Sequence, residues 1–237
     1  MIIVLVGSQV GEAPVAATAK LFADGTRAAF CLALLDGRWR TAGELARGAG
    51  VTASTASEHL SQLVAGGVLA VNQQGRRRYF RLAGPRAAAV LEALAVAAPT
   101  RDESPPDLSR AESALRAGRT CYDHLAGRLG VALTDALIAV EVITADFTLG
   151  DQSRLSPLGI ELPTGSSRPV VRPCLDWTER RHHAAGSLPA ALTRRFFELS
   201  WLQRATHGRA VHLTELGQQG LSELLGTEVP FPDDRFR

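Results

Sequence analysis

The spacing of apolar residues predicts helices over much of the first third of the chain. Residues 14–37 carry apolar side chains at helical intervals in two pieces, and Asp24 or Thr26 is suited to cap the second piece. A shorter helix is expected to begin at Thr41, whose hydroxyl can cap it, and to end near Ala49. This part of the chain is therefore predicted to be largely helical.

A further helix and a hairpin complete the unit. Gly50 provides a turn, and Thr52 caps the next helix. Residues 68–73 and 77–82 then read as two strands joined near Gly75. Two helices, a turn and a hairpin in this order predict a winged helix-turn-helix. The apolar side of its second helix consists of Ala56, Leu60, Leu63 and Val64.

A proline-rich segment divides the chain. Residues 98–107, APTRDESPPD, contain three prolines and alternating charges without apolar periodicity, which indicates a linker. We therefore expect a winged helix-turn-helix DNA-binding domain at residues 1–97 and an effector-sensing domain at residues 108–237. The predicted fold class is mainly α with small β-hairpins.

The second domain contains an internal repeat. Residues 124–143 and 183–202 share seven identities in twenty at an offset of 59, and residues 155–159 and 213–217 match at an offset of 58. Each copy is expected to hold one or two helices, a strand-like piece such as FTL or RAVHL, and a capped turn ending in glycine. Because that order resembles the second half of a winged helix, we predict two degenerate winged-helix-like repeats.

Composition and charge indicate the class of protein and the compartment in which it is expected. The chain is 46% hydrophobic and 21% charged, an ordinary globular composition. Residues 1–100 carry 10 basic and 6 acidic side chains, whereas residues 101–237 carry 16 and 18. Lys20 is the only lysine, and arginine suits contacts with phosphates and bases. The opening MIIVLV is too short to cross a bilayer, and three cysteines do not suit a disulfide framework, so we expect a cytoplasmic protein without membrane contact.

The basic part carries the groups that DNA binding requires. The second helix of the motif offers short hydrogen-bonding side chains for base edges, and the hairpin tip offers three arginines for phosphates. Either feature alone is compatible with a solvated surface, but both in this order indicate a double-stranded DNA operator. The candidate DNA-binding residues are Thr52, Ser54, Thr55, Ser57, His59, Gln62, Arg76, Arg77 and Arg78.

Three stretches resemble the arsenic-repressor (ArsR) family of bacterial winged-helix regulators: LFADGTRAAFCLALL, SEHLSQLVAGGVL and GRRRYFRL. The resemblance covers roughly residues 14–97 and implies a homodimer that releases DNA when an effector binds. The helices at residues 14–23 and 85–97 are the expected dimer interface, since both are apolar. The usual metal sites of that family are absent, because AGELA has no cysteine and PRAAAVLEALAVA has no histidine. Sensing is therefore expected in the second domain.

Two Arg-x-Cys-x-Asp motifs stand at the head of the repeats: Arg119-Cys121-Asp123 and Arg172-Cys174-Asp176. Asp176 is predicted to cap a helix, with Glu179 closing a capping box. If Asp123 is also a cap, each thiol lies beside an arginine at a helix N-terminus, which lowers the pKa of the thiol. If a helix runs through instead, Cys121 and His124 lie on one face and form a workable ligand pair.

Four interpretations of these motifs stay open: an organic-effector pocket, a thiol switch between Cys121 and Cys174, a metal site, or capping and packing only. The candidate effector-binding residues are Arg119, Cys121, Asp123, His124, Arg172, Cys174, Asp176 and Trp177. The candidate ligands for a thiophilic metal are Cys121, His124, Cys174, His182 and His183. DNA binding itself requires no cofactor.

Catalysis is not predicted. The sequence has no phosphate-binding loop, dinucleotide fingerprint, paired-histidine zinc helix or nucleophile elbow. A helix-turn-helix in front of a sensing domain indicates a sequence-specific transcriptional regulator, a repressor whose operator affinity is set by a small effector. The alternative is a metal- or thiol-redox-responsive regulator that uses Cys121 and Cys174, and the remote alternative is an enzyme with a DNA-binding domain.

Overall fold

The computed structural model describes residues 15–98, 110–160, 162, 167–206 and 208–226. The chain divides into two compact units, here called unit 1 (Met1–Leu32 and Trp39–Ala83) and unit 2 (Ala33–Arg38 and Gly84–Arg237). The opening MIIVLV and residues 99–107 of the predicted linker lie outside the described residues. Among the residues that are described, no helix has the length and apolar character needed to span a membrane.

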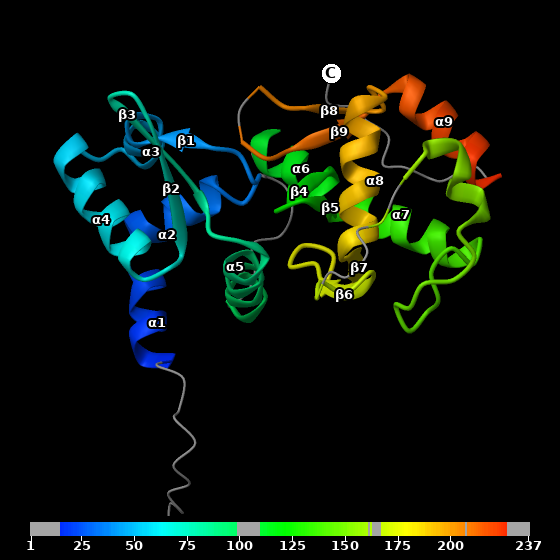
Figure 1. Ribbon diagram of the computed structural model, residues 1–237, viewed down its shortest axis with the longest axis horizontal. Coiled ribbons are helices and arrows are strands. Elements are labelled where there is room, and N and C mark those ends of the chain that lie inside the picture. The colour runs from blue at the N-terminus through cyan, green and yellow to red at the C-terminus, as the bar shows by residue number, and fades with distance from the viewer. Residues whose placement is uncertain (1–14, 99–109, 161, 163–166, 207, 227–237) are drawn as a thin grey trace, which may run out of the picture. The chain divides into compact units, whose positions relative to one another are not determined.

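Unit 1 is a winged helix-turn-helix (Figure 1). Its strands form one antiparallel sheet in the order β1-β3-β2, with Leu69 opposite Leu82 at the base of the hairpin. The helices and the hairpin predicted from the apolar pattern are confirmed. The elements are α1 (Val15–Phe22), α2 (Gly25–Ala33), β1 (Arg40–Thr41), α3 (Ala42–Ala49), α4 (Ala53–Ala65), β2 (Leu69–Gln74) and β3 (Arg77–Leu82).

Side-chain caps explain where these helices begin. Asp24, rather than Thr26, caps α2, because its Oδ1 accepts a hydrogen bond from the backbone N–H of Arg27 at 2.9 Å. Thr41 and Glu44 cap α3 reciprocally, each side chain accepting from the backbone N–H of the other. The apolar sides of the elements then form the core, with Phe30, Leu45, Ala56, Leu60, Leu63, Phe80 and Leu82 all buried.

Unit 2 alternates hairpins with helices. It opens with α5 (Pro85–Ala97) and α6 (Arg110–Ala117). The first copy of the repeat contains β4 (Arg119–Cys121), β5 (His124–Ala126), α7 (Gly127–Ala139) and the 3-10 helix η1 (Ser153–Leu158). The second copy contains β6 (Arg172–Leu175), β7 (His182–Ala185), α8 (Ser187–Glu198), β8 (Leu202–Arg204), β9 (Val211–Leu213) and α9 (Glu215–Leu225).

The two predicted copies are present and share one core formed mainly by α7, α8 and α9. Their correspondence extends to single hydrogen bonds: Thr134 Oγ1 donates to the carbonyl of Gly130, and Thr193 Oγ1, 59 positions later, donates to the carbonyl of Pro189, both at 2.8 Å. The first copy has lost its second hairpin, because Ile143 and Leu149 form only an isolated bridge. The FTL segment is therefore not a strand, whereas RAVHL contains β9.

Helix α5 belongs to the compact unit 2, whereas the predicted first domain extends to residue 97. Glu92 of α5 forms a buried ion pair within this unit, with its Oε1 2.9 Å from Arg209 Nη1. Residues 33–38, which connect α2 to β1, also belong to unit 2.

Candidate DNA-binding face and candidate metal site

Helix α4 and the β2–β3 hairpin carry the predicted DNA-binding residues. Of these, Thr52, Ser54, Gln62, Arg76, Arg77 and Arg78 are exposed, and Thr55, Ser57 and His59 are half-buried. The hairpin and the helix meet, because Arg78 Nη2 donates to Ser57 Oγ at 3.3 Å. The face therefore combines short polar side chains with a cationic hairpin tip.

Some of these residues also have structural contacts. The Thr52 hydroxyl caps α4 by accepting from the backbone N–H of Thr55 at 3.2 Å. Arg27 Nη1 donates to Gln62 Oε1 at 2.8 Å and lies 3.3 Å from His59 Nδ1. Arg27 thus positions two predicted reading residues. Sequence reasoning missed it, because nothing in the local pattern links α2 to α4.

The Arg-x-Cys-x-Asp motifs lie in hairpins, so both helical interpretations of them are wrong. Cys121 pairs with His124 across β4–β5, and Cys174 pairs with His183 across β6–β7. Tyr122 and Asp123 form the first turn. Asp176 closes the second turn instead of capping a helix, since its Oδ1 accepts from the backbone N–H groups of residues 178 and 179 at 2.9 and 3.1 Å.

The two hairpins bring their cysteines and histidines together. One ligand atom from each of Cys121, His124, Cys174 and His183 lies within 4.8 Å of the others, and all four residues are buried. His182 does not join them: neighbouring strand residues face opposite ways, so its ring is exposed and stands edge-on to Phe147 at 6.0 Å. Four of the five predicted metal ligands therefore converge.

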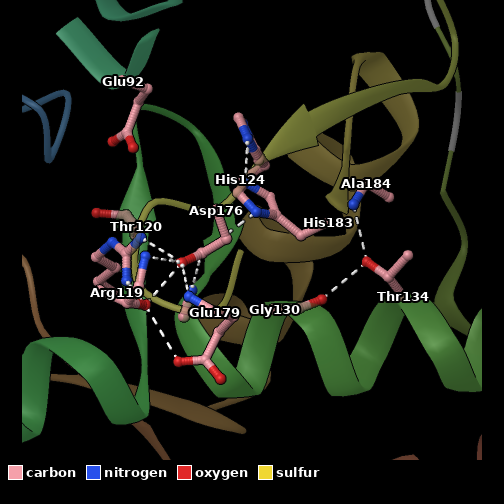
Figure 2. Close-up of polar contacts among 12 residues, drawn as sticks. Glu92, Arg119, Thr120, His124, Gly130, Thr134, Asp176, Glu179, His183 and Ala184 are labelled. Atoms are coloured by element: carbon pink, nitrogen blue, oxygen red, sulfur yellow. Dashed lines mark hydrogen bonds and ion pairs between the residues drawn. The ribbon is translucent and has the colours of Figure 1, made fainter. Parts of the chain in front are cut away.

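The two imidazoles face each other through one nitrogen and face carboxylates through the other. Nε2 of His124 and Nε2 of His183 are 3.2 Å apart. Nδ1 of His124 lies 3.3 Å from Asp123 Oδ1, and Nδ1 of His183 lies 3.3 Å from Asp176 Oδ2. Figure 2 shows the paired rings with Asp176 beside His183. Each carboxylate favours a proton on Nδ1, which leaves Nε2 as a lone pair aimed at the cluster.

An arginine holds each carboxylate, but the remaining contacts differ between the copies. Asp176 accepts from Arg119 Nη2 at 2.9 Å and from the backbone N–H of Gly127 at 2.7 Å. Asp123 accepts from both terminal nitrogens of Arg168, at 2.6 and 3.0 Å, and Arg168 also donates to the carbonyl of Gly186. Gly127 and Gly186 are 59 positions apart, but Gly127 donates to the carboxylate and Gly186 accepts from the arginine, so the outer shell follows the repeat only in part.

Two sequence expectations about this shell need correction. The arginine that pairs with Asp123 is Arg168, which lies outside the repeated motif and was not predicted. Arg172, a candidate effector-binding residue, donates to the carbonyl of Pro173 at 3.3 Å instead of pairing with an aspartate of the shell. The side chain of Trp177 lies against Arg119, with the guanidinium carbon 4.9 Å from the ring centroid. It contributes packing to the shell.

Hydrogen bonding and burial set the charge of the cluster. The hydrogen bond from Cys121, and further bonds from the two histidines, lower the pKa of Cys174 despite its burial. The same thiol pair and burial raise the pKa of Cys121. Burial opposes the charged form of His183, but Asp176 and Cys174 raise its pKa overall. Of the two cluster cysteines, Cys174 is therefore the one that favours the thiolate form.

The outer carboxylate and the third cysteine behave differently. Burial alone raises the pKa of Asp123, but hydrogen bonds from His124 and Arg168 lower it to about 2. Cys31 is a fully buried core residue of α2, as expected, and burial raises the pKa of its thiol to about 12. Cys31 is therefore an inert internal reference for the cluster cysteines.

A winged helix-turn-helix with an arginine-tipped hairpin defines a DNA-binding protein. Residues 22–72 match the helix-turn-helix domain family. The chain is 36% identical over 222 residues to the uncharacterized HTH-type transcriptional regulator YdfF of Bacillus subtilis (strain 168), which covers 91% of this chain and 98% of that protein. The chain belongs to the family of HTH-type transcriptional regulators and is a DNA-binding transcriptional regulator.

Solved structures similar to the chain match about its first third. One is the solution structure of the homodimeric winged helix-turn-helix DNA-binding domain of a possible ArsR-family regulator from Mycobacterium bovis, 32% identical, covering 35% of this chain and 76% of that chain with a TM-score of 0.33. A crystal structure of fragment 1–100 of a possible transcriptional regulatory protein from the same organism is 32% identical, covering 35% and 88% with a TM-score of 0.33.

Proposed function

We propose that this regulator is a homodimeric repressor whose affinity for its operator is set by Zn²⁺ held by Cys121, His124, Cys174 and His183. The observation that carries the proposal is the convergence of these four buried ligands within 4.8 Å. Two thiolates and two imidazoles are the donor set of a tetrahedral zinc site. DNA is read by α4 and the β2–β3 hairpin.

The spacing of the imidazoles fits a bound metal as well as a hydrogen bond between the two rings. Two nitrogens that bind Zn²⁺ tetrahedrally at 2.0–2.1 Å are separated by about 3.3 Å. The observed separation of the Nε2 atoms is 3.2 Å. With Nδ1 of each ring directed at a carboxylate, two lone pairs would face each other, an arrangement that a cation or a shared proton stabilises.

The other interpretations have less support. The cavity between the repeats, lined by Leu125, Thr134 and Thr193 among others, has a volume of about 10 Å³, which is room for one water and not for an organic effector. A disulfide between Cys121 and Cys174 would leave two carboxylate-paired imidazoles unexplained. Capping alone does not require two cysteines and two histidines to converge.

The proposal is tested by metal analysis combined with operator titration. Protein purified without chelator is expected to contain one zinc per chain, and Co²⁺ substitution should give a thiolate-to-cobalt absorption band. The Cys121→Ser and Cys174→Ser variants should lose both, whereas Cys31→Ser, a matched control, should keep both. Operator affinity should fall by about 5- to 150-fold on adding zinc and recover with chelator.

The titrations also separate the alternatives. Reversible loss of DNA binding on oxidation, with no metal bound, would support the thiol switch and contradict the metal site. A co-purified organic molecule would support an effector pocket. If wild type and the two variants bind no metal and give the same operator affinity in every titration, the cluster is a packing feature and the proposal is wrong.

A further inference from the structure

One connection of the winged helix is built into unit 2. Residues 33–38 start at the last residue of α2 and lead toward β1, yet they belong to the compact unit that contains the Cys/His cluster. We call them the 33–38 loop. Leu34 and Leu35 are buried, and Asp36 is only 2% exposed. The loop is continuous along the backbone with α2 and β1.

The 33–38 loop contacts the turn of the first ligand hairpin. The backbone N–H of Tyr122 donates to the carbonyl of Leu35 at 2.8 Å. Gly37 approaches so closely that a Cβ there would lie 3.1 Å from the carbonyl oxygen of Tyr122. Tyr122 stands between the ligands Cys121 and His124 and has a left-handed φ of 60°. The loop is thus attached to the residue that joins two proposed metal ligands.

A second contact holds the loop from its other end. Arg38 Nε lies 2.9 Å from Asp36 Oδ2, and Arg38 Nη2 donates to the carbonyl of Gly208 at 3.1 Å. The neighbouring carbonyl, that of Arg209, accepts from the backbone N–H of Thr120 in strand β4 at 3.0 Å. The loop therefore contacts the turn of the first ligand hairpin directly through Leu35, and it reaches strand β4 indirectly from Arg38 through residues 208 and 209.

The two halves of the cluster differ in how firmly they are held. Asp176 and His183 of the second half have fully buried side chains, as has Arg119 of β4, which pairs with Asp176. In the first half, Cys121 and His124 are buried, but the outer pair of Asp123 and Arg168 is 31% and 29% exposed. The turn of the first hairpin therefore has the less enclosed outer shell.

From this arrangement, and resting on the proposed function, we infer that the Cys121–His124 hairpin is the moving part of the sensor and transmits metal occupancy to the DNA-binding unit through the Tyr122–Leu35 contact and the 33–38 loop. The two Nε2 atoms are already 3.2 Å apart, so the movement falls on those ligand atoms that are separated by up to 4.8 Å and would approach to about 3.3–3.8 Å around tetrahedral Zn²⁺. That movement displaces Tyr122. The 33–38 loop follows, and with it the ends of α2 and β1.

The test separates the loss of the close approach between Gly37 and Tyr122 from the backbone strain that any substitution of a left-handed glycine causes. Gly37→Ala places a methyl group against Tyr122 in a left-handed conformation with a φ of +72°. The matched control is Gly159→Ala, because Gly159 also belongs to unit 2, has a φ of +59° and would have no atom within 4 Å of an added methyl group. A second variant, Arg38→Gln, weakens the loop contacts without touching the ligand hairpin.

Operator affinity is measured with Zn²⁺ and with chelator for each variant, and Co²⁺ spectra report site occupancy. Wild type and Gly159→Ala should show the same metal-dependent ratio, about 5- to 150-fold. The Gly37→Ala and Arg38→Gln variants should keep the Co²⁺ band. Their operator affinities with Zn²⁺ and with chelator should differ by no more than about twofold. If the Gly37→Ala variant fails to fold, the metal-dependent ratio of the Arg38→Gln variant tests the inference.

The outcomes distinguish the two proposals. A wild-type ratio in the variants, with the Co²⁺ band present, overturns the transmission route and leaves the metal sensor standing. Absence of metal binding, or of any metal-dependent ratio, in wild type overturns the proposed function and this inference with it.

Discussion

Asp123 and Asp176 face equivalent histidines but differ in burial. Asp176 is fully buried together with Arg119, whereas Asp123 is 31% exposed and pairs with the half-buried Arg168. A carboxylate that accepts from Nδ1 orients the ring and strengthens its other nitrogen as a ligand. Both aspartates therefore orient a histidine, but we expect them to contribute differently to the stability of unit 2.

Substitution of each aspartate by asparagine separates its effect on zinc affinity from its effect on stability. Asp123→Asn should lower zinc affinity by about 10- to 100-fold while leaving the free energy of unfolding of the metal-free protein nearly unchanged. Asp176→Asn leaves Arg119 without its buried counter-ion and should destabilise unit 2 by about 3–5 kcal/mol. Chelator competition and urea denaturation measure the two effects. Equal behaviour of the variants would contradict the difference.

The sequence predicted which residue types could act as ligands better than it predicted which residues contact one another. The sequence identified Cys121, His124, Cys174 and His183, because thiols and imidazoles stand out in any chain. It did not exclude His182, since strand alternation becomes visible only once β7 is known. It also missed Arg168, whose link to Asp123 spans 45 positions and leaves no local signal.

At the scale of elements, the capping box of α3 predicts a pH dependence. Hydrogen bonds from Thr41 lower the pKa of Glu44 below its ordinary value of 4.5. A carboxyl whose pKa is lower in the folded state stabilises above its unfolded pKa, and this contribution is lost as the pH falls through the folded value. Glu44→Gln should therefore flatten the loss of stability below about pH 4.5. Thermal melts between pH 3 and 6 measure it, and an unchanged slope would contradict the box.

The β2–β3 hairpin predicts how DNA binding responds to salt. Arg76, Arg77 and Arg78 are exposed at and beside its tip. Replacing all three with alanine should weaken binding to every sequence and reduce the slope of log affinity against log salt by up to about 2.7, or 0.9 per phosphate contact. Fluorescence anisotropy at several salt concentrations measures the slope.

Exposed arginines of unit 2 provide the control for charge. Arg128→Ala with Arg194→Ala removes two exposed cations outside the winged helix and should leave the slope unchanged. A triple hairpin variant that retains the wild-type slope would show that the hairpin does not contact phosphates.

Elements with strong local signals were predicted correctly, and elements without them were not. Caps and helical spacing identified α2, α3 and α4, because both signals lie within a few residues. Strands β4 to β7 have three or four residues each, too short for an alternating pattern. The cross-strand pairing of cysteine with histidine therefore appears only in the fold.

At the scale of the whole molecule, the homodimer is the part of the proposal that is easiest to test. Helix α1 has no buried residue, and Val90 and Leu94 of α5 are 39% and 49% exposed. Apolar surface of this kind is covered in an assembly. Light scattering at micromolar concentration should give twice the chain mass of 25.2 kDa.

Leu94→Glu should shift the mass toward that of the monomer and weaken operator binding, because one winged helix would engage only one half-site. Arg86→Ala, at an exposed position of the same helix, should change neither mass nor affinity as strongly. A wild-type mass of one chain would contradict the dimer.

The repeat has a consequence for the origin of the cluster. Each copy supplies one cysteine and one histidine, so a single copy holds half of a four-ligand site. An ancestral chain with one copy would have completed such a site only by pairing with a second chain across a two-fold axis. Duplication and fusion of such a chain would make that pairing intramolecular and independent of protein concentration. The fused halves could then differ, as the fully buried Asp176 and the partly exposed Asp123 do.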